Sequence, residues 1–152
     1  MRRKDKEIND IGTIEDIIRK AKVCRLALSE NGWPYIVPLC FGYQDNMLFF
    51  HTGPEGKKID MLRKNNNVCF EIDIDHELIT SKEACKWSMK YQSIIGFGRA
   101  ELIEDIGSKR TALDIIMQHY SDGPFEYPAE TIKKTIIIKI HIESMTGKKS
   151  GY

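Results

Sequence analysis

Two lysines that follow a glycine-bearing turn are the first feature of this sequence that could bind a ligand. Lys57 and Lys58 come directly after the turn 52–56, which separates the apolar run 47–50 from an amphipathic segment typical of a helix. The first backbone N–H groups of a helix lack intrahelical partners, and the helix dipole favours negative charge there. The pattern therefore predicts an anion site with a phosphate as its guest. Lysines are also common on solvated helix faces, so the pattern alone leaves a plain surface role open.

His51 ends the apolar run and immediately precedes the same turn. Its imidazole could face the predicted site and donate a hydrogen bond or a proton, because histidine changes charge near neutral pH. The alternative is a structural histidine that only bonds the backbone of the turn, and both interpretations stay open. His119 and His141 lack such a context, and we assign both to structural roles.

The composition excludes several classes of function. At 152 residues, with 41% hydrophobic and 30% charged residues, the chain is expected to form one globular domain over 1–152. A net charge of +1 gives no basic field for nucleic acid. No apolar run approaches the length of a membrane helix and no signal-peptide core is present, so we expect no membrane segment and a cytoplasmic location. The four cysteines show no CxxC spacing, which indicates reduced thiols and no metal site.

Hydrophobic periodicity predicts an ordered series of strands and helices. A first helix is expected over 13–22 with Thr13 as its N-cap, a second after the turn at 52–56, and a third over 109–120. The six expected strands are 23–28, 33–43, 47–50, 68–74, 91–103 and 135–142. The remaining segments are a charged arm over 1–10, irregular chain over 76–89, a Gly/Pro loop over 121–129 and a polar tail over 147–152.

Turn signals decide how these strands connect. Asn31-Gly32 is the strongest short hairpin signal, and Pro34 and Pro38 in the returning strand indicate an edge, a bulge or a strand end. In strand 68–74 the alternation indicates one wet face. No βαβ alternation with Rossmann glycines is present. The pattern favours a mainly β (α+β) fold built as a small antiparallel barrel.

Several motifs, taken in their order and spacing, resemble those of a known family. They are PYIVPLCF (34–41), LFFHTGPEGKKIDML (48–62), KNNNVCFEI (64–72), KWSMKYQSIIGFGRA (86–100) and MTGKKS (145–150). Together they resemble the pyridoxamine 5′-phosphate oxidase-like split-barrel flavoproteins, specifically the branch related to nitroimidazole-resistance (Nim-type) proteins. The resemblance implies a six-stranded antiparallel split β-barrel with flanking helices, and it covers nearly the whole chain.

The resemblance also implies a homodimer with one FMN in each of two clefts between the subunits. In such a dimer Lys57 and Lys58 would hold the flavin phosphate, and His51 would lie beside the flavin as the candidate catalytic residue. The remaining implied cofactor contacts are the strand backbones of Arg25, Leu26, Ala27, Val37, Pro38 and Leu39, then Ser93, and Trp87 and Tyr91 of the neighbouring subunit. The chain lacks the full set of arginines that clamp pyridoxal phosphate in the true oxidases, so that oxidase activity is not expected.

The leading functional hypothesis is an FMN-dependent oxidoreductase that passes electrons from NADH or NADPH to a small acceptor such as a nitro-aromatic. A second hypothesis, of a different class, is a flavin- or haem-binding module without turnover. A third is a structural dimer whose cleft stays empty. The residues alone separate these three poorly.

Overall fold

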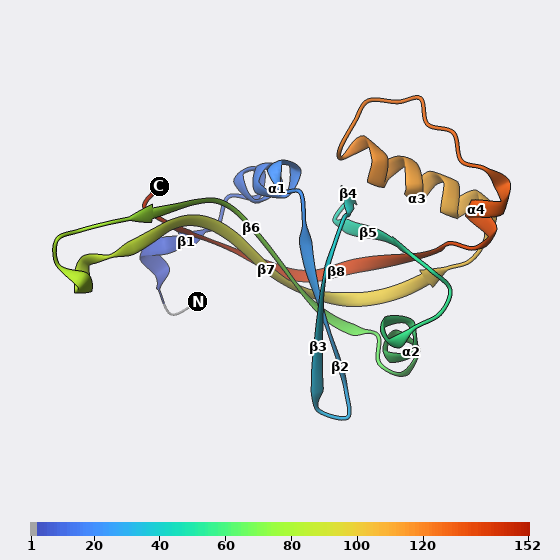
Figure 1. Cartoon of the computed structure of the whole chain (residues 1–152), viewed down its shortest axis with the longest axis horizontal. Coiled ribbons are helices and arrows are strands. Elements are labelled where there is room, and N and C mark those ends of the chain that lie inside the picture. The colour runs from blue at the N-terminus through green and yellow to red at the C-terminus, as the bar shows by residue number, and fades with distance from the viewer. Residues whose placement is uncertain (1–2) are drawn as a thin grey trace.

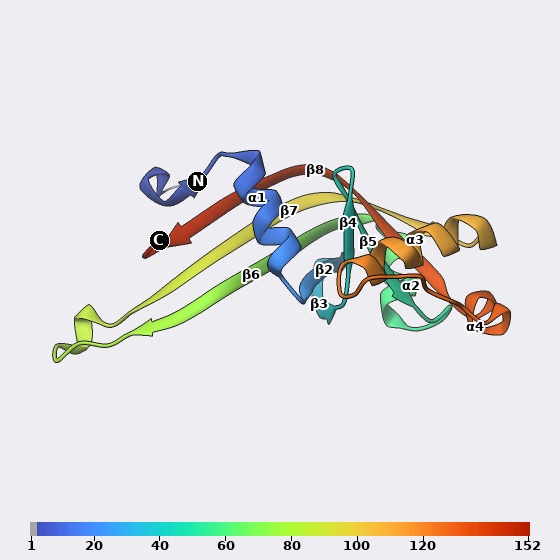
Figure 2. The same ribbon diagram turned by 90° about the horizontal axis from the view of Figure 1, so that it is seen from above.

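One long antiparallel sheet organises the chain. The computed structural model describes residues 3–152, and in this part of the chain eight strands form a single sheet (Figures 1 and 2). The path runs β3-β2-β6-β7-β8-β5-β4, with β1 paired to β8. The strands are β1 (Glu7–Ile8), β2 (Cys24–Glu30), β3 (Trp33–Leu39), β4 (Gly42–Gln44), β5 (Met47–Thr52), β6 (Asn67–Ile79), β7 (Ser88–Ile103) and β8 (Ile136–Ser150).

The helices lie on both faces of the sheet. They are α1 (Ile11–Lys20), α2 (Lys57–Lys64), α3 (Ile106–Gln118) and α4 (Ala129–Lys133), with 3₁₀ turns η1 (Lys4–Lys6) and η2 (Ala84–Lys86). The apolar stripes of α1 and α2 pack on the inner face of the curled sheet and enclose the main core with β2, β5, β6 and β8. On the opposite, outer face, α3 covers β4, β5 and β8, where it builds a second small core around Phe49 and Ile137.

The predicted mainly β, antiparallel fold is confirmed, while the predicted number of strands is wrong. The two additional strands are β1, inside the expected charged arm, and β4, which was expected as the end of one strand over 33–43. That strand is interrupted because the Phe41 N–H donates to the Tyr120 hydroxyl at 2.8 Å instead of to a neighbouring strand. The sheet path ends at β3 and at β4, so the barrel stays open rather than closed.

The predicted hairpin at Asn31-Gly32 is confirmed. Both residues have positive φ, 50° and 81°, and they join β2 to β3 in continuous antiparallel register. Pro34 and Pro38 lie on β3, an end strand of the sheet path, where a missing N–H donor can face away from the ladder.

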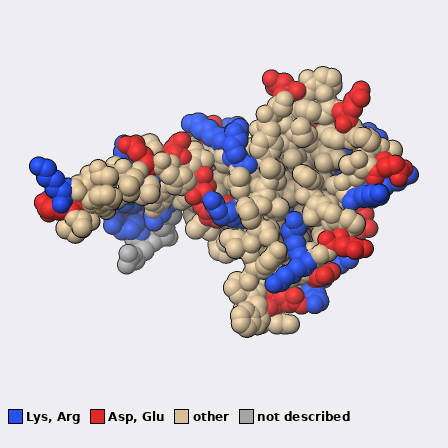
Figure 3. Space-filling view, viewed as in Figure 1, with Lys and Arg blue, Asp and Glu red and all other residues tan. Residues whose placement is uncertain are grey.

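The expectation of irregular chain over 76–89 is wrong at both ends of that segment, where strand residues extend β6 and β7 into a projecting arm (Figure 3). β6 continues to Ile79 and β7 begins at Ser88, so the two strands form a long twisted arm that extends away from the body (Figures 1 and 2). The register shifts between Ile74 and Glu77, where Asp75 has a φ of 57°. This bulge changes which face the following residues occupy, and the alternation that marks a strand is lost in the sequence.

The expected termini are also corrected. Residues 147–150 are not a tail but the end of β8, which pairs with β7 on one side and β1 on the other. In the expected arm over 1–10, Glu7 pairs with Lys148, and Ile8 with Gly147. Residues 1–2 of that arm lie outside the described residues. A short polar segment can therefore be a strand when two neighbours supply the ladder.

The expected helices are present: α2 begins directly after the turn as predicted, and the other two start earlier. α1 begins at Ile11 because Asp10, not Thr13, is its N-cap: the Asp10 carboxylate accepts from the Thr13 N–H at 2.8 Å and from its hydroxyl at 2.7 Å. α3 likewise begins at Ile106 behind an Asp105 cap. The short α4 begins at the end of the expected Gly/Pro loop.

Candidate functional site

The start of α2 presents free backbone donors. Its N-cap is Gly56, at a φ of 115° that a side chain rarely adopts, and it therefore offers no side-chain cap. The first intrahelical bond runs from the Asp60 N–H to the Gly56 carbonyl. The N–H groups of residues 57–59 consequently have no intrahelical acceptor, which is the arrangement that binds anions.

Lys57 and Lys58 add two uncompensated positive charges at this helix start. Neither takes part in any of the ion pairs formed within residues 3–152, whereas Lys64 at the other end of α2 pairs with Glu30. Burial lowers the pKa of the half-buried Lys58 amine. The sequence prediction of an anion-binding helix start agrees with this geometry, and a bound phosphate would compensate both charges.

Strand β3 lies beside this helix start. The Lys57 ammonium stands 4.6 Å from the centroid of the Tyr35 ring, a cation–π distance. Because side chains alternate along a strand, Val37 and Leu39 share the inner face with Tyr35 and pack against the main core. Tyr35 is a site residue that sequence reasoning missed, although the hairpin register could have placed it opposite Leu28.

The cofactor residues predicted on β2 and β3 divide between the two faces of the sheet. Leu26 is fully buried in the core opposite Val37. Arg25 and Ala27 point to the outer face, where Arg25 lies opposite Pro38. Only part of the predicted set can therefore contact one ligand through side chains, which fits the expectation that these strands would act through their backbone.

Arg25 is already engaged by neighbouring acids. Its guanidinium pairs with Glu71 at 2.9 Å and with Asp73, and Asp73 also pairs with His76 at 2.7 Å. Burial, and then the nearby Asp73 charge, raise the pKa of Glu71 despite the opposing effect of Arg25. The side chain of Arg25 is thus committed to a cross-strand network.

His51 lies on β5, directly before the turn that leads to α2. Its exposed side chain points to the outer face of the sheet, the same face as that of the buried Phe49. Within residues 3–152 its ring has no hydrogen-bond partner, so the structural alternative of a bond to the turn has no support in this geometry. His119, assigned to structure, bonds the Ala21 carbonyl at 2.7 Å. His141 bonds Glu101 at 2.7 Å.

The remaining predicted residues lie at the opposite end of the sheet. Ser93 pairs with Lys148 on β8, whereas Thr52, next to the predicted phosphate site, pairs with Ile136 on the same strand. These two partner positions are twelve residues apart along β8. Trp87 and Tyr91 lie farther toward the arm, where the indole N–H of Trp87 donates to the Ser81 carbonyl at 2.7 Å. These three residues therefore lie on a part of the sheet different from that beside the lysine pair.

An exposed apolar row crosses the outer face and was not predicted. Ladder register aligns Ile36 with Ala27, Ala27 with Cys69, and Cys69 with Phe97. Ile36 is 58% exposed and Phe97 is 54% exposed, and Ile95 extends the row at 47%. The predicted alternation of strand 68–74 is confirmed, since Val68, Phe70, Ile72 and Ile74 are buried while Cys69, Glu71 and Asp73 are partly exposed. Apolar residues on both faces of YIVPL and GFG were the sequence signal for this row.

The match to a family model decides the family. The model described as pyridoxamine 5′-phosphate oxidase matches residues 10–149. The chain belongs to the pyridoxamine 5′-phosphate oxidase family. This confirms the resemblance that the motifs indicated. No curated protein matches the chain.

Solved structures agree with this family fold. A protein of Bacteroides thetaiotaomicron with a proposed role in 5-nitroimidazole antibiotic resistance is 41% identical, with a TM-score of 0.85, covering 94% of this chain and 86% of that one. The flavocytochrome Anf3 of Azotobacter vinelandii is 20% identical, with a TM-score of 0.87 and coverage of 100% and 72%. The FAD and haem binding protein of Mycobacterium smegmatis is 18% identical, with a TM-score of 0.87 and coverage of 97% and 74%. The last two show the fold alone.

Two further features of this family member concern metals and membranes. Within residues 3–152 no group of three or more His, Cys, Asp and Glu side chains is arranged to hold a metal ion. None of the helices in that range is both long and apolar enough to span a membrane. The individual cofactor contacts stay predictions, and the structure supplies the positions from which each can be tested.

Proposed function

We propose that the protein is an FMN-dependent oxidoreductase that passes electrons from NADH or NADPH to a small acceptor such as a nitro-aromatic. The observation that carries the proposal is the pair Lys57 and Lys58 at a helix start with no side-chain cap and no acidic partner in the described chain. A phosphate monoester carries up to two negative charges and several acceptor oxygens. Charge-assisted bonds to both ammonium groups and to the free N–H groups fit that group.

The relatives support the choice of cofactor and acceptor. The Bacteroides protein, at 41% identity, has a proposed role in resistance to 5-nitroimidazole antibiotics, which supports a nitro-aromatic acceptor. A flavocytochrome and an FAD and haem binding protein share the fold, which supports a flavin in this architecture. We choose FMN rather than a dinucleotide because the lysine pair offers one compact anion site.

The residues of the chain would bind and orient, while a bound flavin would supply the electron chemistry. Lys57 and Lys58 hold the phosphate at one end of the ligand. Tyr35 and Val37, partly buried and adjacent on the same face of β3, offer apolar surface for an aromatic ring beside Lys57. His51, exposed at the end of β5, would be the candidate donor of a proton to the acceptor.

We also propose a homodimer with the cofactor at the subunit interface. Lys57 lies beside β3, whereas Ser93, Tyr91 and Trp87 lie on β7 and toward the arm, so we expect two half-sites in each chain. A two-fold axis joins unlike ends of two identical chains and creates two equivalent composite sites. The exposed row Ile36, Ala27, Cys69 and Phe97 gives such a pair an apolar contact surface between these ends. We place the protein in the cytoplasm, where its four free thiols stay reduced.

Reconstitution with FMN and a steady-state assay test the proposed function. The expected results are a yellow protein that elutes with one FMN per chain and that oxidises NADH or NADPH only when a nitro-aromatic acceptor is added. Retained flavin without turnover would instead support the binding module, and a Soret band in the purified protein would support haem. Failure to retain any flavin at micromolar concentration would contradict both.

A further inference from the structure

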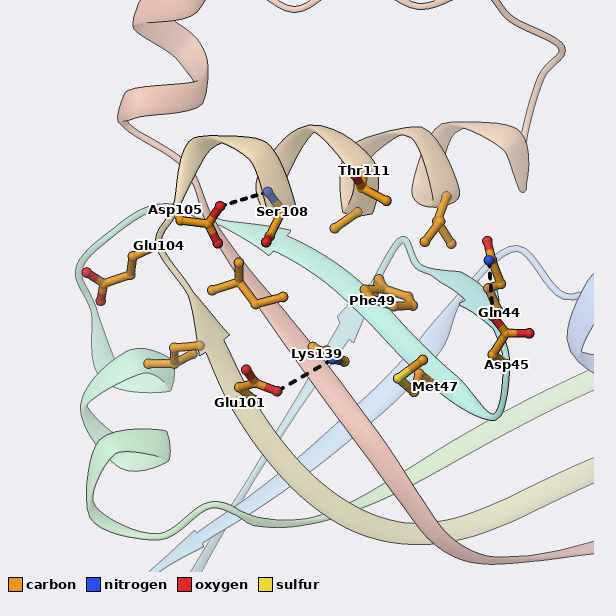
Figure 4. A pocket seen from close by; sticks show the side chains of 14 residues that line it. Gln44, Asp45, Met47, Phe49, Glu101, Glu104, Asp105, Ser108, Thr111 and Lys139 are labelled. Atoms are coloured by element: carbon orange, nitrogen blue, oxygen red, sulfur yellow. Dashed lines mark hydrogen bonds and ion pairs between the residues drawn. The ribbon is translucent and has the colours of Figure 1, made fainter.

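A cavity of about 460 Å³ lies between α3 and the outer face of β5, β7 and β8 (Figure 4). This volume is in the range of small-molecule sites in proteins. The close-up shows α3 along one side, the β4–β5 hairpin at one end and the start of α3 at the other. None of the residues predicted to hold the flavin lines this cavity.

The interior of the cavity is apolar and includes an aromatic ring. Phe49 lies at its centre with Met47 beside it on β5 (Figure 4), and Ile103 on β7 also lines the cavity. Ala112 and Ile115 on α3 close the opposite side. Such walls favour a flat apolar group, because it can contact the sheet residues and the helix residues at the same time.

The polar rim is strongly acidic. Four carboxylates line it, those of Asp45, Glu101, Glu104 and Asp105, against one cation, Lys139. Lys139 is partly neutralised, since its ammonium lies 3.6 Å from the Glu101 carboxylate. Asp105 is occupied by its N-cap bond to the Ser108 N–H at 2.9 Å. Glu104 pairs with Arg63 at 3.8 Å, so Asp45 at one end and Glu101 at the centre are left to attract positive charge.

The charge on Glu101 is held in place by its neighbours. His141 bonds Glu101 at 2.7 Å, and this bond, with the charges of Lys139 and His141, lowers the pKa of the carboxyl. Glu101 therefore stays ionised while one side of it faces the cavity. The acidic rim contrasts with the paired cations at the start of α2, so a phosphate has no favourable position in this cavity.

We propose that the cavity between α3 and the β5–β8–β7 face is a second ligand site that binds a planar aromatic cation. The ring packs against Phe49 and the apolar face of α3, and the positive group lies toward the carboxylates of the rim. An ammonium or amidinium near Phe49 also gains a cation–π contact. The site is separate from the proposed flavin site and does not depend on it.

Three probes of nearly equal size and shape test the charge preference in the full chain. They are benzamidine, benzamide and benzoate, which carry a positive, a zero and a negative charge. Titration into ¹⁵N-labelled protein should shift the amide signals of Phe49, Glu101 and Thr111 and leave those of Lys57 and Lys58 unchanged. We expect benzamidine to bind about tenfold more tightly than benzamide, the effect of one charge-assisted hydrogen bond in a partly solvated site.

Matched variants make the result specific to this cavity. Glu101→Gln and Asp45→Asn together should reduce the benzamidine preference to below about threefold. The control Glu77→Gln/Glu143→Gln removes the same two charges, from glutamates paired with Lys90 and Arg99 outside the cavity, and should not. Thr111→Trp places a large ring at the exposed cavity wall and should abolish binding of all three probes.

Several results would overturn the proposal. They are equal binding of benzamidine and benzamide, tighter binding of benzoate, and shifts confined to the start of α2. A fourth is a change of oligomeric mass in Thr111→Trp, because that result would assign the cavity to a contact between two copies of the chain.

Discussion

Removal of the lysine pair at the start of α2 is the most direct test of the phosphate site. The variant Lys57→Ala/Lys58→Ala should fold normally, because neither ammonium has an acidic partner in the described chain and surface changes of this kind alter stability by about 0.5 kcal/mol or less. Alanine also favours the helix that both residues begin. The loss should therefore appear in flavin binding and not in the melting temperature.

The structure sets the size of the expected effect. A hydrogen bond to a charged group contributes about 1.5–3 kcal/mol, but Lys57 is exposed and Lys58 only half-buried, so solvent screens part of each. Together we expect a loss of about 2–4 kcal/mol, which raises the Kd for FMN by about 30- to 700-fold. The free N–H groups of residues 57–59 remain and keep some residual affinity.

Quenching of flavin fluorescence during titration measures this Kd. The matched control is Arg63→Ala/Lys64→Ala, which removes two positive charges from the other end of the same helix, where they pair with Glu104 and Glu30. An equal loss of FMN affinity in both double variants would show that only the net charge of the helix matters. An unchanged Kd in the Lys57/Lys58 variant would place the phosphate elsewhere and refute the reasoning.

Four further predictions follow from particular residues. Phe97→Glu places a charge in the exposed apolar row and should convert a dimer into a monomer of 17.6 kDa by light scattering, with loss of flavin. His51→Ala should retain FMN but slow reoxidation by a nitro-aromatic by about 10²- to 10⁴-fold in stopped-flow measurements. Gly96→Ala should lower the free energy of unfolding by about 1–3 kcal/mol, because its Cβ would lie 2.1 Å from the Phe70 ring. Burial lowers the pKa of Lys58 in the folded state below its ordinary value of 10.5. At pH values between the two pKa values, the unfolded chain therefore binds more protons than the folded chain. The free energy of unfolding should therefore rise with pH through this window in urea titrations, and that rise should be missing in Lys58→Met.

Each of these has a control and a contrary outcome. Ile106→Glu, at an equally exposed apolar position on α3, should leave the dimer intact, and a monomeric parent would end the dimer proposal. A rate per bound flavin that is unchanged in His51→Ala would exclude a catalytic role. Gly53→Ala meets nothing within 4 Å and should be nearly neutral, so an equal loss there would show that close contact with Phe70 is not the cause. If the free energy of unfolding of Lys58→Met changed with pH as that of the parent does, the change would belong to other groups.

Features formed by neighbouring residues could be predicted from the sequence. The hairpin at Asn31-Gly32 and the helix that begins at Lys57 depend on turn chemistry and on side-chain periodicity, both of which act over a few residues. The edge position of β3 followed from its two prolines. Errors occurred where the local signal was interrupted, as at the bulge after Ile74, or was supplied by distant chain, as for residues 147–150.

The candidate site likewise combines features that depend on neighbouring residues with features that depend on distant parts of the chain. The lysine pair, the uncapped helix start and the position of His51 before the turn were determined by the sequence, because one continuous segment carries all three. Tertiary structure alone decided that Tyr35 lies beside Lys57, that Arg25 is held by acids on β6, and that Ser93 lies opposite Lys148 on β8 rather than beside the lysine pair. These facts depend on strand pairing between residues far apart in the chain, and the free energy of that pairing comes from the whole sheet, so no single segment encodes it.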